Sequence, residues 1–136
     1  MMVSTRGRYA LRVLMDLAEH TDNGYTPIKD VAARQDISKK YVEQIIPVFV
    51  KNGLVTGVQG KSGGYRLTRL PEEYTVGEIL RLAEGDLAPV ACLSCDAEPC
   101  SRHDKCKTIA MWSRFNELTN DFFDGITLAD LMKEQI

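Results

Sequence analysis

The sequence predicts a mainly α-helical fold with one small β-hairpin, and three observations carry that prediction. In the first 52 residues, apolar side chains recur at steps of three and four, the spacing of one face of a helix. Residues 54–69 hold two β-branched and aromatic stretches around a Gly-rich loop, the pattern of a hairpin. Residues 108–126 carry a long stripe of large apolar side chains at helical spacing.

The length and composition allow one ordinary hydrophobic core. A chain of 136 residues with 44% hydrophobic and 26% charged residues can bury such a core without covalent crosslinks. No segment approaches the ~20 consecutive apolar residues that span a bilayer, and no signal-peptide pattern is visible. We therefore expect a cytoplasmic protein with no membrane partner. In that reducing compartment, a cysteine cluster is more typical of metal binding or redox sensing than of structural disulfides.

Charge divides the chain at residue 70. Residues 1–70 carry 11 Lys and Arg against 6 Asp and Glu, a net charge of +5, whereas residues 71–136 carry 6 against 13, a net charge of -7. A basic half suits a polyanion, because Lys and Arg near phosphates release condensed counterions; a chance imbalance on a solvated surface gives the same count. Charge alone therefore separates a basic half, 1–70, from an acidic half, 71–136.

Two amphipathic helices open the chain. Residues 5–20 place their apolar side chains on one face, and Arg6 and Arg8 stand near the beginning of this helix. Thr26 followed by Pro27 has the pattern of an N-cap and a first helical residue, so a second, short helix is expected to begin there and reach about residue 34.

A third helix follows after a turn of a few residues. Ser38 is a good N-cap for it. Pro47 lies within the continuing apolar pattern, and because proline has no N–H and its ring clashes with the preceding turn, we expect a kink or a break beside it. The side chains on the outward face are those of Lys39, Lys40, Glu43 and Gln44.

A hairpin and a fourth helix come next. LVTGV at 54–58 and YRLTR at 65–69 enclose the polar loop QGKSGG, so two strands with a Gly-rich turn are expected. Thr75 and Glu78 have the spacing of a capping box, which begins a helix that Gly85 ends.

The last long helix carries more apolar surface than a small domain can cover. Residues 108–126 are therefore expected to pack against a second copy of the chain, with an ordinary core helix as the alternative. Thr127 and Asp130 have the spacing of another capping box, which begins a short final helix. The large apolar residues of the stripe are Ile109, Met111, Trp112, Phe115, Leu118, Phe122, Phe123 and Ile126.

Three helices followed by a hairpin is the order of a winged helix-turn-helix, in which the third helix enters the major groove of DNA. Gln44 can pair with adenine, Glu43 can accept from a cytosine amino group, and Lys39 can reach guanine or phosphate. The hairpin tip suits a minor groove. The candidate DNA-binding residues are Arg6, Arg8, Ser38, Lys39, Lys40, Tyr41, Glu43, Gln44, Gln59, Lys61 and Ser62.

Six stretches in this order, GRYALRVLMDLA, ISKKYVEQI, KNGLV, GKSGGYRL, DKCKTIAMW and ITLADL, resemble the winged-helix family of Rrf-type transcriptional regulators that includes IscR, NsrR, RirA and CymR. The resemblance implies a homodimer that binds a palindromic operator on double-stranded DNA, with the helix over 108–126 as its dimer helix. Some relatives carry an arginine just before the loop glycine, where this chain has Gln59, so Lys61 is the better cation of the wing.

All the cysteines lie in one loop, ACLSCDAEPCSRHDKC at residues 91–106. Thiolates suit an iron-sulfur cluster. Cys92 and Cys95 also form a C-x2-C knuckle that His103 and the remaining cysteines could complete around zinc. A pair of these thiols could instead oxidise to a disulfide as a metal-free switch, and an inert loop is the plain alternative.

The family resemblance favours the cluster, as [2Fe-2S] or [4Fe-4S], over zinc. It implies that Cys92, Cys100 and Cys106, spaced C-x7-C-x5-C, are ligands. The fourth ligands used by relatives fall here on Ile109 and Arg8, neither of which matches. Cys95 is the first candidate in their place, and His103 or a group from the other subunit is the next.

The sequence therefore predicts a DNA-binding transcriptional regulator, a repressor, that senses iron, redox or nitrosative state through a cluster on the cysteine loop. Its predicted parts are a winged helix-turn-helix DNA-binding domain over 1–70 and a helical dimerisation and sensor region over 71–136, which contains the cysteine loop at 91–106. The alternatives are a cluster-free regulator of the same family that acts by thiol oxidation or protein contact, and a zinc-binding regulator. The rival of another class is an enzyme or electron carrier. The sequence shows neither a phosphate-cradling loop nor a catalytic set of His, Asp and Glu, so an enzyme is not expected.

Overall fold

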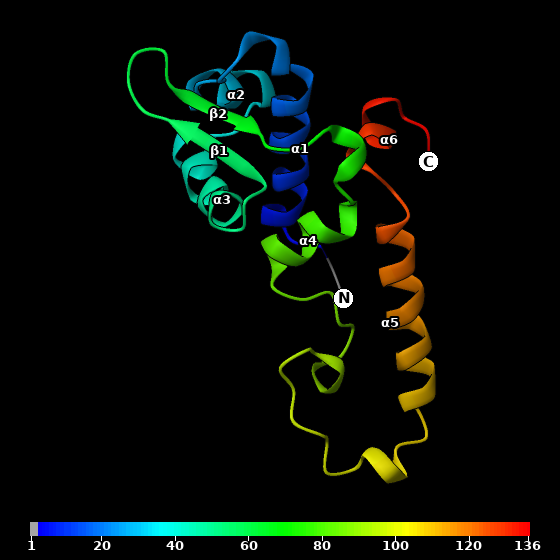
Figure 1. Cartoon of the computed structure of the whole chain (residues 1–136). Helices are drawn as coiled ribbons and strands as arrows, with labels where there is room; N and C mark the ends of the chain where they lie inside the picture. The colour runs from blue at the N-terminus through cyan, green and yellow to red at the C-terminus, as the bar shows by residue number, and fades with distance from the viewer. Residues whose placement is uncertain (1–2) are drawn as a thin grey trace.

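In the computed structural model, which describes residues 3–136, the elements of the N-terminal half surround helix α1 (Thr5–Glu19) (Figure 1). Its N-cap is Ser4, whose hydroxyl accepts a hydrogen bond from the N–H of Gly7. Most of the apolar side chains that predicted this helix are buried, among them Val13 and Leu14, which are fully buried. Helix α1 is thus the centre of the core. Its beginning lies against Glu84, later in the chain.

The helix-turn-helix consists of α2 (Ile28–Gln35) and α3 (Lys39–Lys51), joined by a turn in which Asp36 adopts a left-handed φ of 55°. Ser38 caps α3 as predicted, with its hydroxyl accepting from the N–H of Tyr41. Asp16 of α1 is 1% exposed and accepts two hydrogen bonds from the guanidinium of Arg34. This ion pair, in which Asp16 is buried and Arg34 is exposed, fixes the end of α2, and with it the turn that leads into α3.

Two local expectations differ from the structure. Thr26 does not cap α2: its N–H and carbonyl bond the carbonyl and N–H of Tyr65, each at 2.8 Å, and Pro27 is the N-cap. Of the kink or break expected at Pro47, the structure excludes the break, because α3 runs unbroken through this residue. The buried side chains of Ile46 and Phe49 on either side of Pro47 hold the helix against the core despite the missing N–H.

The wing is an antiparallel pair of strands, β1 (Val55–Val58) and β2 (Gly64–Leu67), in which Val55 is opposite Leu67 and Val58 is opposite Gly64. Gly64 is required by close approach, because a Cβ at this position would collide with the backbone of Thr26. The loop end of the strand pair is therefore held directly against the entry of α2.

Helix α4 (Val76–Glu84) follows a single turn of 3-10 helix, Pro71–Glu73. The hydroxyl of Thr75 accepts from the N–H of Glu78, as predicted. The other half of the expected capping box is replaced: the Glu78 carboxylate accepts from Arg69 at 2.9 Å. The side chain that sequence assigned to a local cap thus joins α4 to the segment that leaves the wing.

Residues from both sides of position 70 share one hydrophobic core. Tyr74, Ile79 and Leu128 are fully buried in the same cluster as the side chains of α1 and α3. The division of the chain at residue 70 therefore remains a prediction about roles, since residues from both sides build one core. Leu128 belongs to α6 (Leu128–Met132), where Thr127 and Asp130 form the predicted capping box with both hydrogen bonds present.

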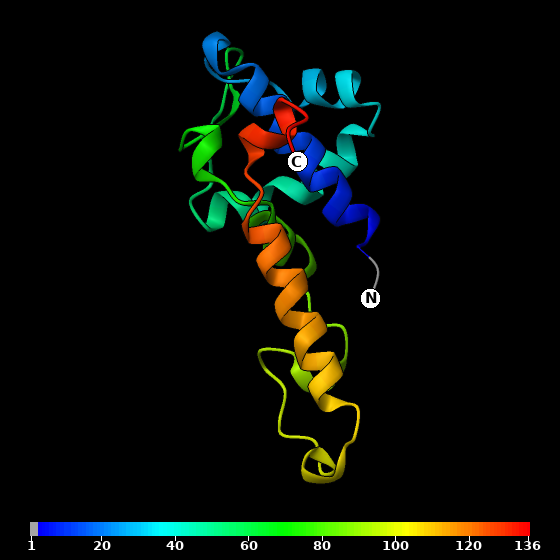
Figure 2. The same cartoon turned by 90° about the vertical axis from the view of Figure 1, so that its right-hand side faces the viewer.

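Helix α5 (Ile109–Asp124) extends away from this body, and the loop between α4 and α5 lies at its far end (Figure 2). Two single turns of 3-10 helix, Ala91–Leu93 and His103–Lys105, are the regular structure within that loop. Across residues 3–136, no helix has both the length and the apolar character needed to cross a membrane.

Tyr74 joins the wing to the beginning of α4. Its ring is fully buried, and its hydroxyl donates to the carbonyl of Leu54 at 2.7 Å. The same oxygen accepts from the N–H groups of Thr68 and Arg69, both at 3.0 Å. One side-chain oxygen thus satisfies three backbone groups from both sides of the hairpin.

We expect Tyr74→Phe to lower the free energy of unfolding by about 1–3 kcal/mol, because it removes the three hydrogen bonds of the Tyr74 hydroxyl and leaves the N–H of Arg69 without its partner, without creating a cavity. Urea unfolding followed by circular dichroism measures this loss. Tyr25→Phe is the control, since it removes a hydroxyl from a half-buried ring, and its effect should stay within about 0.5 kcal/mol. Equal effects of the two substitutions would contradict the role assigned to the Tyr74 hydroxyl.

Candidate DNA-binding surface and cysteine loop

Helix α3 presents one face to solvent and one to the core. Val42, Ile45 and Phe49 are buried. Tyr41 is half-buried, because its ring packs edge-on against Tyr9 at 5.5 Å between centroids. Its predicted role in DNA contact is therefore combined with a packing role. The predicted DNA-binding residues on the outward face, all exposed, are Ser38, Lys39, Lys40, Glu43 and Gln44.

A groove of about 530 Å³ separates the first turn of α3 from the wing. Lys39 and Glu43 line one wall, and the glycines of the wing line the other. Lys29, an exposed residue in the first turn of α2, lines the same groove. Lys29 is not among the DNA-binding residues predicted from the sequence. The available signal was a cation shortly after the Thr26–Pro27 pair that precedes the helix.

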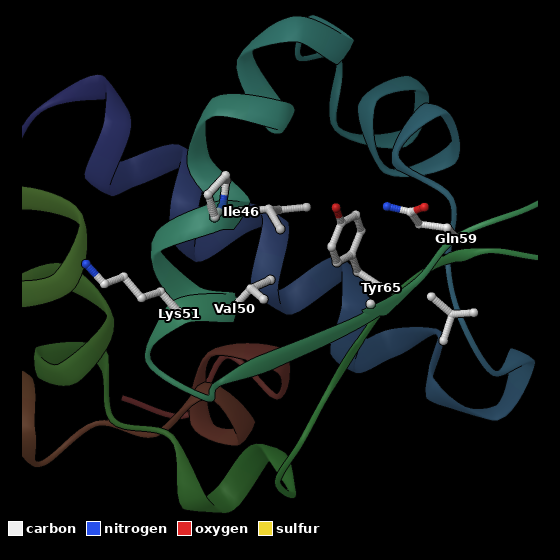
Figure 3. A pocket seen from close by; sticks show the side chains of 8 residues that line it. Ile46, Val50, Lys51, Gln59 and Tyr65 are labelled. Carbon is white, nitrogen blue, oxygen red and sulfur yellow. The ribbon is translucent and has the colours of Figure 1, made fainter.

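A second cavity, of about 410 Å³, lies between the wing and the C-terminal half of α3 (Figure 3). Tyr65 projects into it from β2, and the side chain of Gln59 points toward the Tyr65 ring, whereas Lys51 points away (Figure 3). Gln59 lines both this cavity and the first groove. It directly follows β1 at the start of the hairpin loop, while the exposed Lys61 and Ser62 lie at the tip.

The two arginines at the start of α1 differ in their surroundings, although both are exposed. Arg6 donates from Nη2 to the backbone carbonyl of Gln44 at 3.2 Å, so it lies against α3. Arg8 donates to the hydroxyl of Thr5 at 3.1 Å, within its own helix. The structure thus brings Arg6 to the predicted recognition helix, whereas the hydrogen bond of Arg8 stays within α1.

The cysteine loop, residues 86–108, is held mainly by hydrogen bonds between residues close in sequence, such as Leu93 N–H to Val90 and His103 N–H to Cys100. Asp86 makes the longer contact: its carboxylate accepts from the N–H of Cys95 at 2.9 Å and from the N–H of Ala88. The first part of the loop is thus anchored to the end of α4. The part around Cys100 has no comparable anchor within residues 3–136.

The four thiols differ in environment, and all are free in the described chain. The hydroxyl of Thr108, 3.3 Å from Cys106 Sγ, lowers the pKa of that thiol, and nearby backbone N–H groups and Arg102 act in the same direction. The charge of Asp96 raises the pKa of Cys95. Burial raises the pKa of Asp86, but the N–H groups of Ala88 and Cys95 outweigh it, so that pKa lies below its ordinary value.

The donors of the loop match the chemistry of a cluster, but they are not gathered. Cys92, Cys95 and Cys100 are exposed and Cys106 is half-buried. Between residues 3 and 136, no three His, Cys, Asp or Glu side chains come together as a metal site. Soft anionic thiolates are nevertheless the ligands that iron-sulfur clusters take. Since few long-range bonds hold the loop, closing it around such a group would break little of the fold.

Comparison with known proteins gives one consistent answer. Residues 3–134 match the Rrf2 family, described as iron-dependent transcriptional regulators. The HTH-type transcriptional regulator IscR of Erwinia tasmaniensis is 34% identical over 135 residues, which are 99% of this chain and 81% of that protein. The solved structure of T. potens IscR has a TM-score of 0.75 at 34% identity, covering 100% of this chain and 89% of that one. CymR, the global cysteine regulator of B. subtilis, has a TM-score of 0.78 at 33% identity, covering 98% of each chain.

These relatives are transcriptional regulators and not enzymes, as the sequence predicted. The match covers nearly the whole chain, and the fold confirms the predicted order of three helices followed by a wing. We conclude that this chain belongs to the Rrf2 family and is a DNA-binding transcriptional regulator of the winged helix-turn-helix type.

Proposed function

We propose that this regulator is a cytoplasmic homodimer that represses transcription from a palindromic operator, and that its cysteine loop binds an iron-sulfur cluster as the sensor. The observation that carries the proposal is the position of the free thiols. They lie in the segment between α4 and α5, which leads into the first turn of α5, and the other end of α5 lies beside the rest of the folded chain (Figure 1). A change in the loop therefore acts at the end of a long, rigid helix.

The dimer is supported by the surface of α5. Among residues 109–124 none is buried in this chain. Met111, Phe115, Leu118 and Phe122 recur along one face and are 54%, 44%, 51% and 57% exposed. An apolar stripe of this kind marks an interaction surface, and a second copy offers the same stripe, so the two helices can cover each other.

DNA binding by such a dimer places two α3 helices in major grooves about one helical turn apart. We assign base contacts to Lys39, Glu43 and Gln44, and contacts to phosphates to Lys29 and Lys61. Repression follows if the bound dimer excludes other proteins from the same DNA.

Cluster binding is assigned to Cys92, Cys100 and Cys106, with Cys95 as the first candidate for the fourth ligand and His103 as the next. A bound cluster, [2Fe-2S] or [4Fe-4S], supplies a group that responds to iron, oxidants or nitric oxide. Asp86 holds the N–H of Cys95, so this cysteine is pre-positioned at the start of the loop. The other thiols reach it only when the loop closes.

A second candidate function is a cluster-free regulator that responds through thiol oxidation or protein contact. One observation favours it: the four thiols are not gathered in the described chain. The relative described as a cysteine regulator has the same fold. A zinc site that uses the Cys92–Cys95 knuckle is the third candidate.

Anaerobic purification tests the choice among these candidates. We expect a coloured protein with charge-transfer absorption and with both iron and sulfide bound, because thiolate-to-iron transitions absorb visible light. Cys92→Ala, Cys100→Ala and Cys106→Ala should each abolish the absorption. A comparison of Cys95→Ala with His103→Ala then identifies the fourth ligand. A colourless protein that holds equimolar zinc, or no metal, would contradict the cluster.

Leu118→Glu tests the dimer helix. A charge placed in the apolar stripe has to lose its hydration in the interface, so we expect a monomer by size-exclusion chromatography with light scattering, together with loss of operator binding. Ala110→Glu introduces the same side chain at an exposed position off the stripe, and it should remain dimeric. Dimeric behaviour of both variants would place the interface elsewhere.

Lys29→Ala tests the groove beside the wing. We expect a similar loss of affinity for every DNA sequence and a decrease of about 1 in the slope of log K against log salt, since a phosphate contact carries no sequence information. Lys133→Ala, at an exposed position in the acidic half, is the control and should leave both quantities unchanged. A loss confined to particular operator sequences would instead assign Lys29 to base recognition.

A further inference from the structure

Glu84, the last residue of α4, contacts the beginning of α1. Its Oε1 accepts from the backbone N–H of Ser4 at 3.0 Å and from the Ser4 hydroxyl at 2.6 Å. Ser4 is also the N-cap of α1. A carboxylate that accepts two hydrogen bonds makes a strong contact, and its negative charge is favourable at a helix N-terminus. We call this contact the Ser4–Glu84 clasp.

The clasp lies beside the anchor of the cysteine loop. Gly85 ends α4 with a φ of 84°, a conformation that suits glycine, and Asp86 follows it. Asp86 holds the N–H of Cys95 on the loop, while Glu84 holds Ser4 on α1. The two carboxylates therefore lie on either side of Gly85. A movement of the loop that displaces Asp86 acts on Gly85 and so on Glu84.

On its other side, the clasp leads to the recognition helix. Arg6, two residues after Ser4, donates to the carbonyl of Gln44 at 3.2 Å. Tyr9, one turn further along α1, packs edge-on against Tyr41 at 5.5 Å. Both contacts reach α3 beside residues that are candidates for DNA contact. The start of α1 thus lies between the clasp and the DNA-reading surface.

We propose that Glu84 is a positioning residue that transmits the conformation of the cysteine loop to the recognition helix of the same protomer, through Ser4 and the first turns of α1. This inference rests on the proposed function, since it takes the loop as the sensor. It adds a route to DNA that does not pass through the dimer interface. The hydrogen bonds of the Glu84 side chain go to Ser4 and not to the thiols, so Glu84 acts through Ser4.

Gly7 offers a variant that breaks the clasp without weakening the helix. A Cβ at Gly7 would collide with Glu84 Oε1, the end of a flexible side chain that can move away. Alanine is favoured over glycine inside a helix, so Gly7→Ala should fold at least as well as the wild type. Glu84→Leu removes the acceptor outright. Glu84→Gln keeps an acceptor oxygen and is the conservative rescue, and Glu72→Leu, at an exposed position, is the matched control.

The first measurement is the operator Kd of the full-length protein with and without the cluster. We expect loading to change the Kd of the wild type by about fivefold or more, a typical coupling between two sites. In Gly7→Ala and Glu84→Leu, the change should be clearly smaller than in the wild type, because the loop no longer acts on α1 and only the route through α5 remains. Glu84→Gln and Glu72→Leu should keep the wild-type ratio.

The second measurement, hydrogen exchange by mass spectrometry, needs no DNA. In the wild type, loading should alter amide exchange in peptides from the loop, from the start of α1 and from the first turns of α3. In Gly7→Ala, the response should be confined to the loop. A purely structural role of Glu84 would not produce this, since Gly7→Ala keeps the helix intact.

The outcomes separate the inference from the proposed function. If the variants bind the cluster, as their absorption shows, and keep both the wild-type Kd ratio and the exchange response in α3, the inference is overturned and the proposed function stands. If the wild type binds no cluster, or binds operator equally well with and without it, the proposed function fails and the inference fails with it.

Discussion

The packing of α4 against α1 is the contact on which the rest of the structure depends. Ile79 of α4 is fully buried in the cluster that contains Leu14 and Leu17 of α1. Val76 and Leu80, on the neighbouring face of α4, are buried in a second cluster with Leu87. A helix buried on two faces cannot shift without opening cavities, so α4 moves, if at all, as a rigid part of the core.

Charged side chains of α4 join this rigid helix to three other parts of the chain. Glu78 binds Arg69 after the wing, and Glu84 binds Ser4 at the start of α1. Arg81 donates to Asn120 and Asp124 of α5. Each of these pairs is partly exposed, so each adds less to stability than the apolar contacts do. Their main effect is on orientation, because they set how the wing, α1 and α5 lie relative to α4.

The sequence predicted what local signals determine and missed what distant partners determine. Ser38, Thr127 and Asp130 cap their helices as predicted, because a cap depends on residues within one turn. Thr26 was assigned to a cap but pairs with Tyr65, which is distant in sequence. Glu78 was likewise assigned to a local box but pairs with Arg69. Lys29 was missed, because its role depends on a groove that only the folded wing creates.

The cysteine spacing named a set of donors, yet it could not place them. Ligand geometry is set by the bound group and by the long-range bonds of the loop, and the loop has few of the latter. Regular elements are specified by burial, whereas Cys92, Cys95 and Cys100 are exposed and hold no fixed position by packing. The same weakness of the loop suits a sensor, because the loop can change its shape while the core remains folded.

The two ends of the cysteine loop explain how one site can act on two parts of the molecule. The loop begins at α4, where Asp86 and Glu84 flank Gly85, and it ends at the first turn of α5, where Thr108 contacts Cys106. A change in the span of the loop pulls on both ends. In the proposed dimer, the pull at α5 alters the separation of the two recognition helices, whereas by the proposed route through Glu84 the pull at α4 alters the seating of α1 against α3 within one protomer. Operator affinity depends on both the spacing and the tilt of the recognition helices, so the two effects act on the same equilibrium.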